Sequence, residues 1–324
     1  MNLNGSRPDT VVETPVAANE ISTFADLFCG IGGFHVAAAN LGMKCVFACD
    51  IDPVAREVYE LNFNMRPGAD IAALDLGMVP TADVLFAGLP CQSFSIIGNR
   101  QAFGDHRGTL FLELARVVAA KRPKAIVIEN VRQLVTIDKG EAFRCIIILL
   151  EALGYSVTHK ILNALDFGLP QKRERVFIVA LDVPVDSFQW PEGGVEMNPL
   201  SAILEDQPHP RHYVSPRIRR ARKQAHTAKE TPAIWHENKG GNVSSHPFSC
   251  ALRAGASHNY LLVDGERRLT PRELFRLQGF PEDYVLPETD AAARRLTGNA
   301  VPVPLAQAVI KQVQSVYEKA TIAG

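Results

Sequence analysis

The 324-residue sequence has almost no net charge, because 34 Lys and Arg residues face 35 Asp and Glu residues. This balance excludes a uniformly basic nucleic-acid-binding protein, so any surface for a polyanion must be local. The sequence also lacks an apolar run that approaches ~20 residues, the length of a membrane-spanning helix. We therefore expect no membrane span.

The sequence has six cysteines but no C-x-x-C pair, which disfavours both a zinc site and a disulfide framework. We expect no metal and a reducing, cytoplasmic environment. Residues 1–20 contain no apolar core segment of the kind found in a signal peptide, and we interpret them as a flexible N-terminal arm. No internal repeat is visible.

Hydrophobic residues make up 47% of the chain, and 21 prolines and 23 glycines punctuate it. Strand and helix patterns alternate up to about residue 183, after which prolines become dense and the alternation stops. This predicts an α/β, doubly wound domain with a second, smaller domain. The expected boundaries are a first domain at 21–185 plus 296–324, a second domain at 186–268 and a connecting hinge at 269–295.

The first strand, predicted for 21–28, is followed by the turn Gly30-Ile31-Gly32-Gly33 and a helix at 34–41. Such a turn receives an adenosine-containing ligand in doubly wound folds. The G-x-G-G spacing differs from G-x-G-x-x-G and argues against a dinucleotide. The second strand, 44–49, ends at Asp50, which is placed to bind ribose hydroxyls or to cap the helix that begins at Pro53. Asp70, in a predicted third strand at 69–71, either binds an adenine amino group or closes a turn.

Cys91 follows the apolar strand 84–88, which Pro90 ends, so its thiol lies in a loop at the carboxyl edge of the sheet. A lone cysteine is more often a small buried hydrophobe than a nucleophile. However, Glu129 follows the buried strand 125–128 in the same way, so two strand ends offer a thiol and a carboxylate to one crevice. The polar, glycine-containing loop 93–108 is typical of a mobile lid.

Two basic segments remain open to two interpretations. Lys172, Arg173 and Arg175 precede the strand 176–181, where they either decorate a sheet edge or hold phosphate and carbonyl groups. Residues 211–229 contain seven Lys and Arg and no acid, and 215–223 form a predicted basic helix. This helix is either a solvated face or a surface that contacts phosphates.

Taken together, these segments resemble the C5-cytosine DNA methyltransferase family, and the size resembles its small bacterial members of restriction–modification systems. The resemblance covers residues 21–183 and 266–312, and the motifs that carry it stand in the family's order: Asp26-Leu27-Phe28-Cys29-Gly30-Ile31-Gly32-Gly33, Gly88-Leu89-Pro90-Cys91-Gln92-Ser93-Phe94-Ser95, Glu129-Asn130-Val131, Gln171-Lys172-Arg173-Glu174-Arg175, Leu269-Thr270-Pro271-Arg272-Glu273, Gln278-Gly279-Phe280-Pro281 and Gly298-Asn299-Ala300-Val301-Pro302. Asp50 departs from the pattern, since many relatives have Glu there.

The resemblance implies a Rossmann-like S-adenosyl-L-methionine-dependent fold, with S-adenosyl-L-homocysteine as product. Cys91 would add to C6 of a flipped-out cytosine, Glu129 would hold N3, and Arg173 and Arg175 would orient the base's carbonyl and the surroundings of the thiol. The implied cofactor contacts are Asp26, Leu27, Phe28, Gly30, Ile31, Gly33, Asp50, Ile51, Asp70, Ile71, Pro90, Leu110, Asn299 and Ala300. The expected DNA contacts are Gln92, Ser95, Arg217, Arg219, Arg220, Lys223 and Arg253.

The expected partners are double-stranded DNA and a restriction endonuclease that acts on the same site, with the protein a cytoplasmic, nucleoid-associated monomer. A tRNA cytosine methyltransferase is the main alternative, but such enzymes usually have two prolines before the cysteine, whereas this chain has Leu89-Pro90. A dehydrogenase is disfavoured because the sequence lacks the G-x-G-x-x-G motif of dinucleotide-binding enzymes. A catalytically dead relative is disfavoured because Cys91, Glu129, Arg173 and Arg175 are all present.

Overall fold

The computed structural model describes residues 21–89 and 109–322, and its centre is a six-stranded sheet. The strand order is β2-β1-β3-β4-β7-β5. The first four strands in this order pair in parallel, whereas β7 is antiparallel to both β4 and β5. The strands are β1 Thr23–Leu27, β2 Lys44–Cys49, β3 Val84–Gly88, β4 Ala125–Val131, β5 Ser156–Asn163 and β7 Glu174–Leu181.

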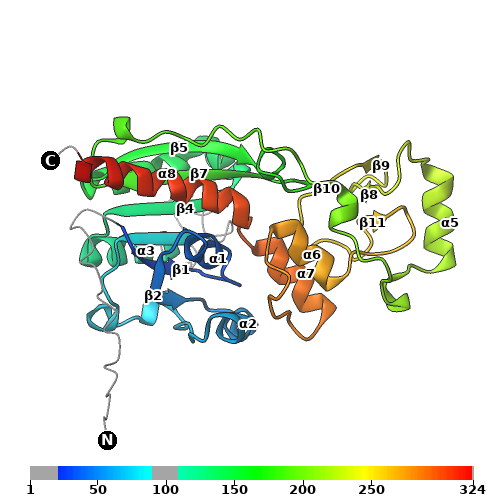
Figure 1. Ribbon diagram of the computed structural model, residues 1–324, viewed down its shortest axis with the longest axis horizontal. Helices are drawn as coiled ribbons and strands as arrows, with labels where there is room; N and C mark the ends of the chain where they lie inside the picture. Colours follow the sequence, from blue (N-terminus) through cyan, green and yellow to red (C-terminus); the bar gives the residue numbers. More distant parts are fainter. Residues whose placement is uncertain (1–20, 90–108, 323–324) are drawn as a thin grey trace, which may run out of the picture.

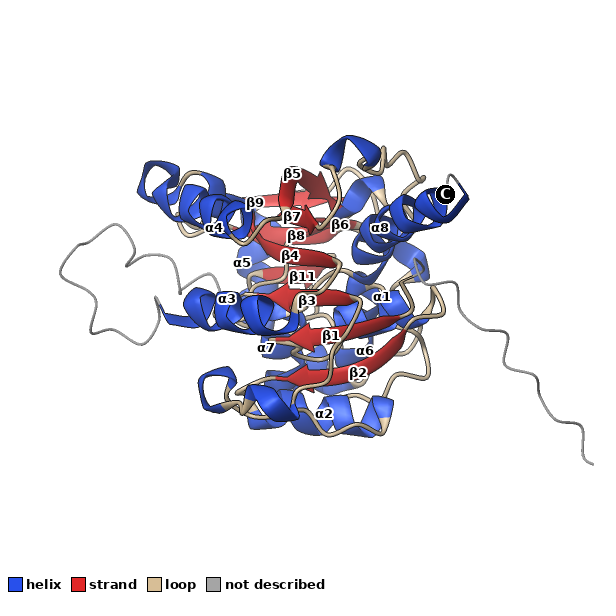
Figure 2. Ribbon diagram, turned by 90° about the vertical axis from the view of Figure 1, so that its left-hand side faces the viewer, coloured by secondary structure: helices blue, strands red, loops and turns tan. Residues whose placement is uncertain are grey.

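Helices cover both faces of this sheet, as the predicted doubly wound fold requires (Figure 2). On one side lie α1 and α8, which pack against each other, and on the other lie α3 and α4. Each face buries its own apolar cluster, because alternate residues of a strand point to opposite faces. The helices are α1 Gly33–Ala39, α2 Pro53–Phe63, α3 Thr109–Lys121, α4 Glu141–Ala152 and α8 Val303–Ile322. The prediction that the last helix packs back on the first half of the chain is confirmed.

A second, smaller group of elements lies at one end of the molecule (Figure 1). Its sheet has the order β11-β8-β9, and a two-stranded pair, β10-β6, lies between it and the large sheet. The elements are β6 Gln171–Lys172, α5 Pro216–Ala225, β8 Ile234–Glu237, β9 Val243–His246, β10 Ser249–Cys250 and β11 Leu261–Val263. The predicted basic helix at 215–223 is α5.

The helices α6 Pro271–Gln278 and α7 Asp290–Asn299 lie between the two groups (Figure 1). The Thr270 side chain and Glu273 form a reciprocal capping box at the start of α6, and Gly279 ends the helix in a left-handed conformation. The loop that follows α6 contacts the turn between β1 and α1, where the Tyr284 hydroxyl donates to the Ile31 carbonyl at 2.6 Å. Asp52 and Arg295 form an ion pair that also joins the two parts.

The third strand predicted at 69–71 is wrong. Only Gly68 forms a bridge to Cys49, and the chain then enters a short 3-10 helix, Ile71–Ala73. The cause is local, because the Asp70 side chain accepts a hydrogen bond from the Ala72 amide at 2.9 Å and caps this helix. The strand that leads to Cys91 is therefore the third, not the fourth. Glu129 lies within β4 rather than after it, since that strand continues to Val131.

Candidate active site

The turn between β1 and α1 is open on its outer side. Phe28, Gly30 and Gly32 all have positive φ angles, so the chain turns sharply over a few residues. A Cβ atom on Gly30 would meet nothing within 4 Å, whereas one on Gly33 would lie 2.4 Å from the Val301 carbonyl oxygen. Gly33 thus allows α1 to pack closely against the 298–302 segment, and Gly30 leaves room for a ligand to approach the backbone.

Asp50 at the end of β2 holds this turn in place. Its two carboxylate oxygens accept from the Gly30 amide at 2.7 Å and the Asp52 amide at 2.8 Å. Burial raises the pKa of Asp50, although both amide hydrogen bonds oppose that shift. The helix cap before α2 is Asp52 and not Asp50, so the alternative interpretation of Asp50 as that cap is wrong. Each oxygen of a carboxylate can accept a second hydrogen bond, which keeps Asp50 competent to bind hydroxyl groups.

The remaining residues of the expected cofactor site differ in exposure. Ile51 is 71% exposed, which is unusual for a large apolar side chain next to a buried strand. Asn299 is also exposed, and Phe28, Asp70 and Leu110 are half-buried. The residues buried in the core are Leu27, Ile31, Ile71 and Ala300. Pro90 lies outside the described residues.

These observations fit an adenosine-containing cofactor. An open glycine turn, a carboxylate beside it and an exposed apolar side chain next in sequence offer backbone, hydroxyl-binding and ring-stacking surfaces at one end of β1 and β2. Within residues 21–89 and 109–322, no group of three His, Cys, Asp or Glu side chains is arranged to hold a metal ion.

Asp26 lies inside the protein and not on the surface of the turn. Its side chain has 0% exposure, and neither carboxylate oxygen has a hydrogen-bond partner among the described residues. It is two residues from Phe24 on β1, so it points to the same core face. Burial, with a contribution from Asp50, raises the pKa of Asp26 well above its usual value. Asp26 therefore favours the neutral form and cannot contact a ligand in the open turn directly.

This burial makes a prediction for stability. When the pKa of an acid is higher in the folded protein than in the unfolded chain, its contribution to the free energy of unfolding depends on pH. The contribution is complete below the unfolded pKa and is lost as pH rises through the folded pKa. We expect Asp26→Asn to be more stable than the wild type at pH 8, with the difference growing from pH 5 by on the order of 1 kcal/mol per pH unit. Urea unfolding at a series of pH values measures this.

Asp83 supplies the matched control, because its environment is the opposite. It accepts from the Ser22 and Thr23 amides at 3.0 Å and pairs with Lys124 at 3.2 Å, and hydrogen bonds lower its pKa despite partial burial. The deficit of Asp83→Asn relative to the wild type should therefore grow as pH rises toward the unfolded pKa of about 3.9 and stay constant above it. If both variants showed the same pH dependence, the interpretation of Asp26 as a neutral buried acid would be wrong.

The ends of β3 and β4 bring the approach to Cys91 beside Glu129. Gly88 is the register partner of Glu129, and the Asn130 side-chain amide donates to the Leu89 carbonyl at 2.9 Å. Leu89 is thus fixed two residues before Cys91. Asn130 was absent from the predicted site residues, although its position directly after Glu129 in the sequence was a usable signal. Cys91, Gln92 and Ser95 lie outside the described residues, as does the whole predicted lid, 93–108.

Glu129 and Arg175 form a buried ion pair. Arg175 Nε lies 2.9 Å from Glu129 Oε1, and both side chains are mostly buried. Antiparallel pairing of β7 with β4 brings them together, since Arg175 is opposite Val131 in the register. Burial raises the pKa of Glu129, and the positive charges of Arg175 and Arg173 oppose this shift. The pair provides a carboxyl group that can hold or share a proton, next to a fixed cation.

The terminal nitrogens of Arg173 bind backbone oxygens, whereas its buried Nε has no hydrogen-bond partner among the described residues. Arg173 is 1% exposed, and its terminal nitrogens donate to the carbonyls of Leu252 at 3.0 Å, Gly298 at 3.1 Å and Ala300 at 2.7 Å. Burial and the nearby Arg175 lower the pKa of Arg173. Arg173 therefore joins the small domain's loop at residue 252 to the 298–300 segment.

Gln171 reinforces this connection and was not among the predicted site residues. Its side-chain oxygen accepts from the Leu252 amide at 3.1 Å, and its nitrogen donates to the Leu277 carbonyl at 2.8 Å. The only signal in the sequence was its place in the segment 171–175, because a buried glutamine cannot be distinguished from an exposed one by pattern. The structure thus brings Glu129, Arg173 and Arg175 together.

The predicted DNA contacts lie elsewhere. Arg217, Arg219 and Arg220 are exposed on α5, which lies at the far end of the second, smaller group of elements (Figure 1). Lys223 on the same helix pairs with Glu266 at 2.5 Å. Arg253 is exposed in the loop that follows Leu252, where its guanidinium lies 4.7 Å from the centre of the Tyr260 ring.

Comparison with known proteins agrees with this geometry. The family described as C-5 cytosine-specific DNA methylase matches residues 22–315. The chain is 47% identical over 289 residues to the Type II methyltransferase M.NgoBI of Neisseria gonorrhoeae, covering 88% of this chain and 91% of that protein. It is 45% identical over 287 residues to the Type II methyltransferase M.HaeII of Haemophilus aegyptius, covering 88% and 90%.

Among solved structures, the Entamoeba histolytica methyltransferase EhMeth superposes with a TM-score of 0.74 at 16% identity, over 93% of this chain and 99% of that one. The fold is therefore the Rossmann-like methyltransferase fold that the sequence predicted. The chain belongs to the C-5 cytosine-specific DNA methylase family, and it is a DNA cytosine methyltransferase. An activity on RNA is the less supported alternative, since the description of the matching family names DNA as the substrate.

Proposed function

We propose that this DNA methyltransferase modifies a flipped-out cytosine within one short duplex sequence, with Cys91 as its nucleophile. The observation that carries the proposal is the buried Glu129–Arg175 pair beside Gly88 and Leu89, which directly precede the Pro90-Cys91 segment. A stacked base cannot reach a buried pair, so the cytosine has to leave the duplex before it reacts.

Covalent catalysis explains why a thiol is needed. Cytosine C5 is a poor nucleophile, and addition of the Cys91 thiolate at C6 makes the ring an enamine that is reactive at C5. Negative charge develops on the ring during this addition. Glu129 shares a proton with N3 and offsets that charge, and a raised pKa suits a carboxyl group for this role. When the C5 proton is later removed, Cys91 leaves and the double bond re-forms.

Arg175 orients the base carbonyl and holds Glu129 in place through the 2.9 Å contact. Arg173 acts as a positioning residue, because its terminal nitrogens are already bound to three carbonyls. The methyl donor is S-adenosyl-L-methionine, which supplies an electrophilic methyl group when bound. The turn at Gly30, the Asp50 carboxylate and the exposed Ile51 would hold its adenosine portion.

Residues 186–268 are proposed as the target-recognition domain, with 269–295 as the hinge. The relatives named Type II methyltransferases favour a restriction endonuclease partner that cuts the same site. A monomer in the cytoplasm, associated with the nucleoid through DNA, remains our expectation. No helix in the described part of the chain combines the length and apolar character that crossing a membrane requires.

The test is incubation of the purified protein with S-adenosyl-L-methionine and plasmid DNA of mixed sequence, followed by single-base sequencing of 5-methylcytosine. We expect methylation confined to one short motif, which would also identify the recognition sequence. The same assay on tRNA tests the alternative. Methylation of tRNA in the absence of any methylation of plasmid DNA would contradict the proposal.

The exposed cations of α5 make a separate prediction. Replacing Arg217, Arg219 and Arg220 by Gln should weaken binding to all duplex sequences, because contacts to phosphates carry no sequence information. The logarithm of the binding constant should then fall less steeply with salt, by about 0.9 for each phosphate that the variant no longer neutralises. Fluorescence anisotropy at several salt concentrations measures this slope. If the salt dependence of binding did not change, the exposed cations of α5 would face solvent and not contact DNA.

A further inference from the structure

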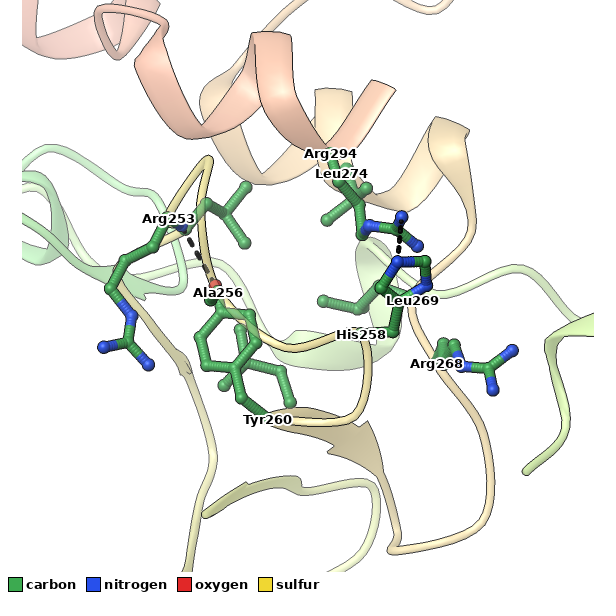
Figure 3. A pocket seen from close by; sticks show the side chains of 10 residues that line it. Arg253, Ala256, His258, Tyr260, Arg268, Leu269, Leu274 and Arg294 are labelled. Atoms are coloured by element: carbon green, nitrogen blue, oxygen red, sulfur yellow. Dashed lines mark hydrogen bonds between the residues drawn. The ribbon is translucent and has the colours of Figure 1, made fainter. Parts of the chain in front are cut away.

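A positively charged cavity lies between the loop 252–260 and the helices α6 and α7 (Figure 3). Its larger part has a volume of about 260 Å³ and adjoins a smaller part of about 30 Å³. His258, Arg268 and Arg294 line both parts, and Arg253 lines the smaller one. The floor is apolar, with Leu269 and Leu274 shared by both parts.

The charges of this cavity are not balanced locally. Within residues 21–89 and 109–322, Arg253, Arg268 and Arg294 form no ion pair. Asp290 is the carboxylate that lines the cavity, and it already pairs with Arg211 at 3.0 Å and lies 3.7 Å from His212. The cavity therefore keeps an excess of positive charge, which attracts anions.

Two of the guanidinium groups are held in place without being neutralised. Arg294 lies 2.9 Å from His258 Nε2, and the two side chains face each other in Figure 3. The lowered pKa of His258, caused by partial burial and by Arg294 and Arg268, favours the neutral ring that can accept this hydrogen bond. Arg268 donates through Nε to the Asn259 side-chain oxygen at 2.9 Å, and its terminal nitrogens have no partner in the described chain.

The cavity is also joined to the active site. Leu252, at the start of its loop, accepts from Arg173 at 3.0 Å. A Cβ atom on Gly298 would lie 2.3 Å from the Ala254 amide nitrogen, so the loop packs directly on the end of α7. A ligand held here lies against the same loop that Arg173 connects to the Glu129–Arg175 pair.

We propose that this cavity binds one backbone phosphate of the substrate DNA, with Arg268 and Arg294 as its principal ligands. The inference rests on the proposed function in that duplex DNA is the ligand. Guanidinium groups present paired donors that match phosphate oxygens, and one phosphodiester would offset part of the excess charge. A phosphate held here would fix the register of the duplex relative to Arg175 and Glu129 without contributing sequence specificity.

The test is the double variant Arg268→Gln/Arg294→Gln, titrated with mixed-sequence duplex DNA at several salt concentrations. We expect at least about tenfold weaker binding at low salt and a salt slope reduced by about 0.9, the value for one phosphate. Arg268→Lys/Arg294→Lys keeps both charges and should keep most of the slope. Lys311→Gln/Lys319→Gln removes two exposed cations from α8 and should change neither quantity.

An unchanged slope in the Gln variant would overturn the proposal. So would an equal loss in the Lys variant, because the effect would then come from packing and not from charge. Methylation of plasmid DNA by the wild type is measured in parallel. If the wild type methylates DNA and the slope is unchanged, only the phosphate site fails. If the slope falls but no 5-methylcytosine forms, the phosphate site stands and the proposed function fails.

Discussion

Cys91→Ala is expected to reduce methyl transfer by at least about 1,000-fold, because the covalent step has no substitute without the thiolate. DNA binding should remain close to that of the wild type, since the variant removes only one sulfur atom. Single-turnover methylation and anisotropy titrations measure the two quantities separately. The residues that precede Cys91 are held in place. The Asn130 side chain binds the Leu89 carbonyl, and Gly88 lies opposite Glu129 in the sheet, so the chain approaches Cys91 from a defined position.

Other cysteines provide the controls for this prediction. Cys145 and Cys250 are partly exposed and free; Cys145 lies on α4, and Cys250 lies on β10, where its register partner is Lys172. Cys145→Ala and Cys250→Ala should each leave the methylation rate within about twofold of the wild type, as is usual for substitutions away from a site. A fluorinated cytosine at C5 should trap the wild type and both controls as covalent adducts, but not Cys91→Ala. Turnover near the wild-type rate in Cys91→Ala would refute its assignment as nucleophile.

Arg173→Met is expected to be among the most destabilising substitutions in the chain, at about 3–5 kcal/mol. The Met side chain fills part of the volume, but the carbonyls of Leu252, Gly298 and Ala300 lose their donor inside the protein. The loop that follows Leu252 should loosen, which raises the KM for DNA. Urea unfolding gives the free energy, and steady-state kinetics give KM and kcat.

Arg175→Met is the matched control for Arg173→Met. Arg175 contacts Glu129 on the neighbouring strand and the Glu174 carbonyl, so its replacement leaves the buried Glu129 carboxyl without its cation and should lower kcat more than Arg173→Met does. Arg173→Lys keeps the positive charge but lacks the planar guanidinium group that binds three carbonyls at once. It should therefore recover only part of the stability that Arg173→Met loses. Equal losses of kcat with unchanged unfolding free energy in both variants would mean that Arg173 acts on the base directly.

Much of the catalytic half was predictable because its signals are local. The apolar runs of β3 and β4, the capping box of Thr270 and Glu273 and the left-handed Gly279 are each fixed by neighbours in the chain. The third strand at 69–71 was wrong for an equally local reason, since the capping hydrogen bond of Asp70 competes with a strand and wins.

The sequence by itself determined the fold class and the family, and it placed Glu129, Arg173 and Arg175 in or directly before the strands β4 and β7. Only the tertiary structure decided how they are used. It buried Asp26 without a partner, paired Glu129 with Arg175 and bound Arg173 to carbonyls up to 127 residues away. It also gathered Arg253, Arg268 and Arg294 around one cavity. The reason is physical: burial and long-range contacts depend on how elements pack, and no local pattern encodes them.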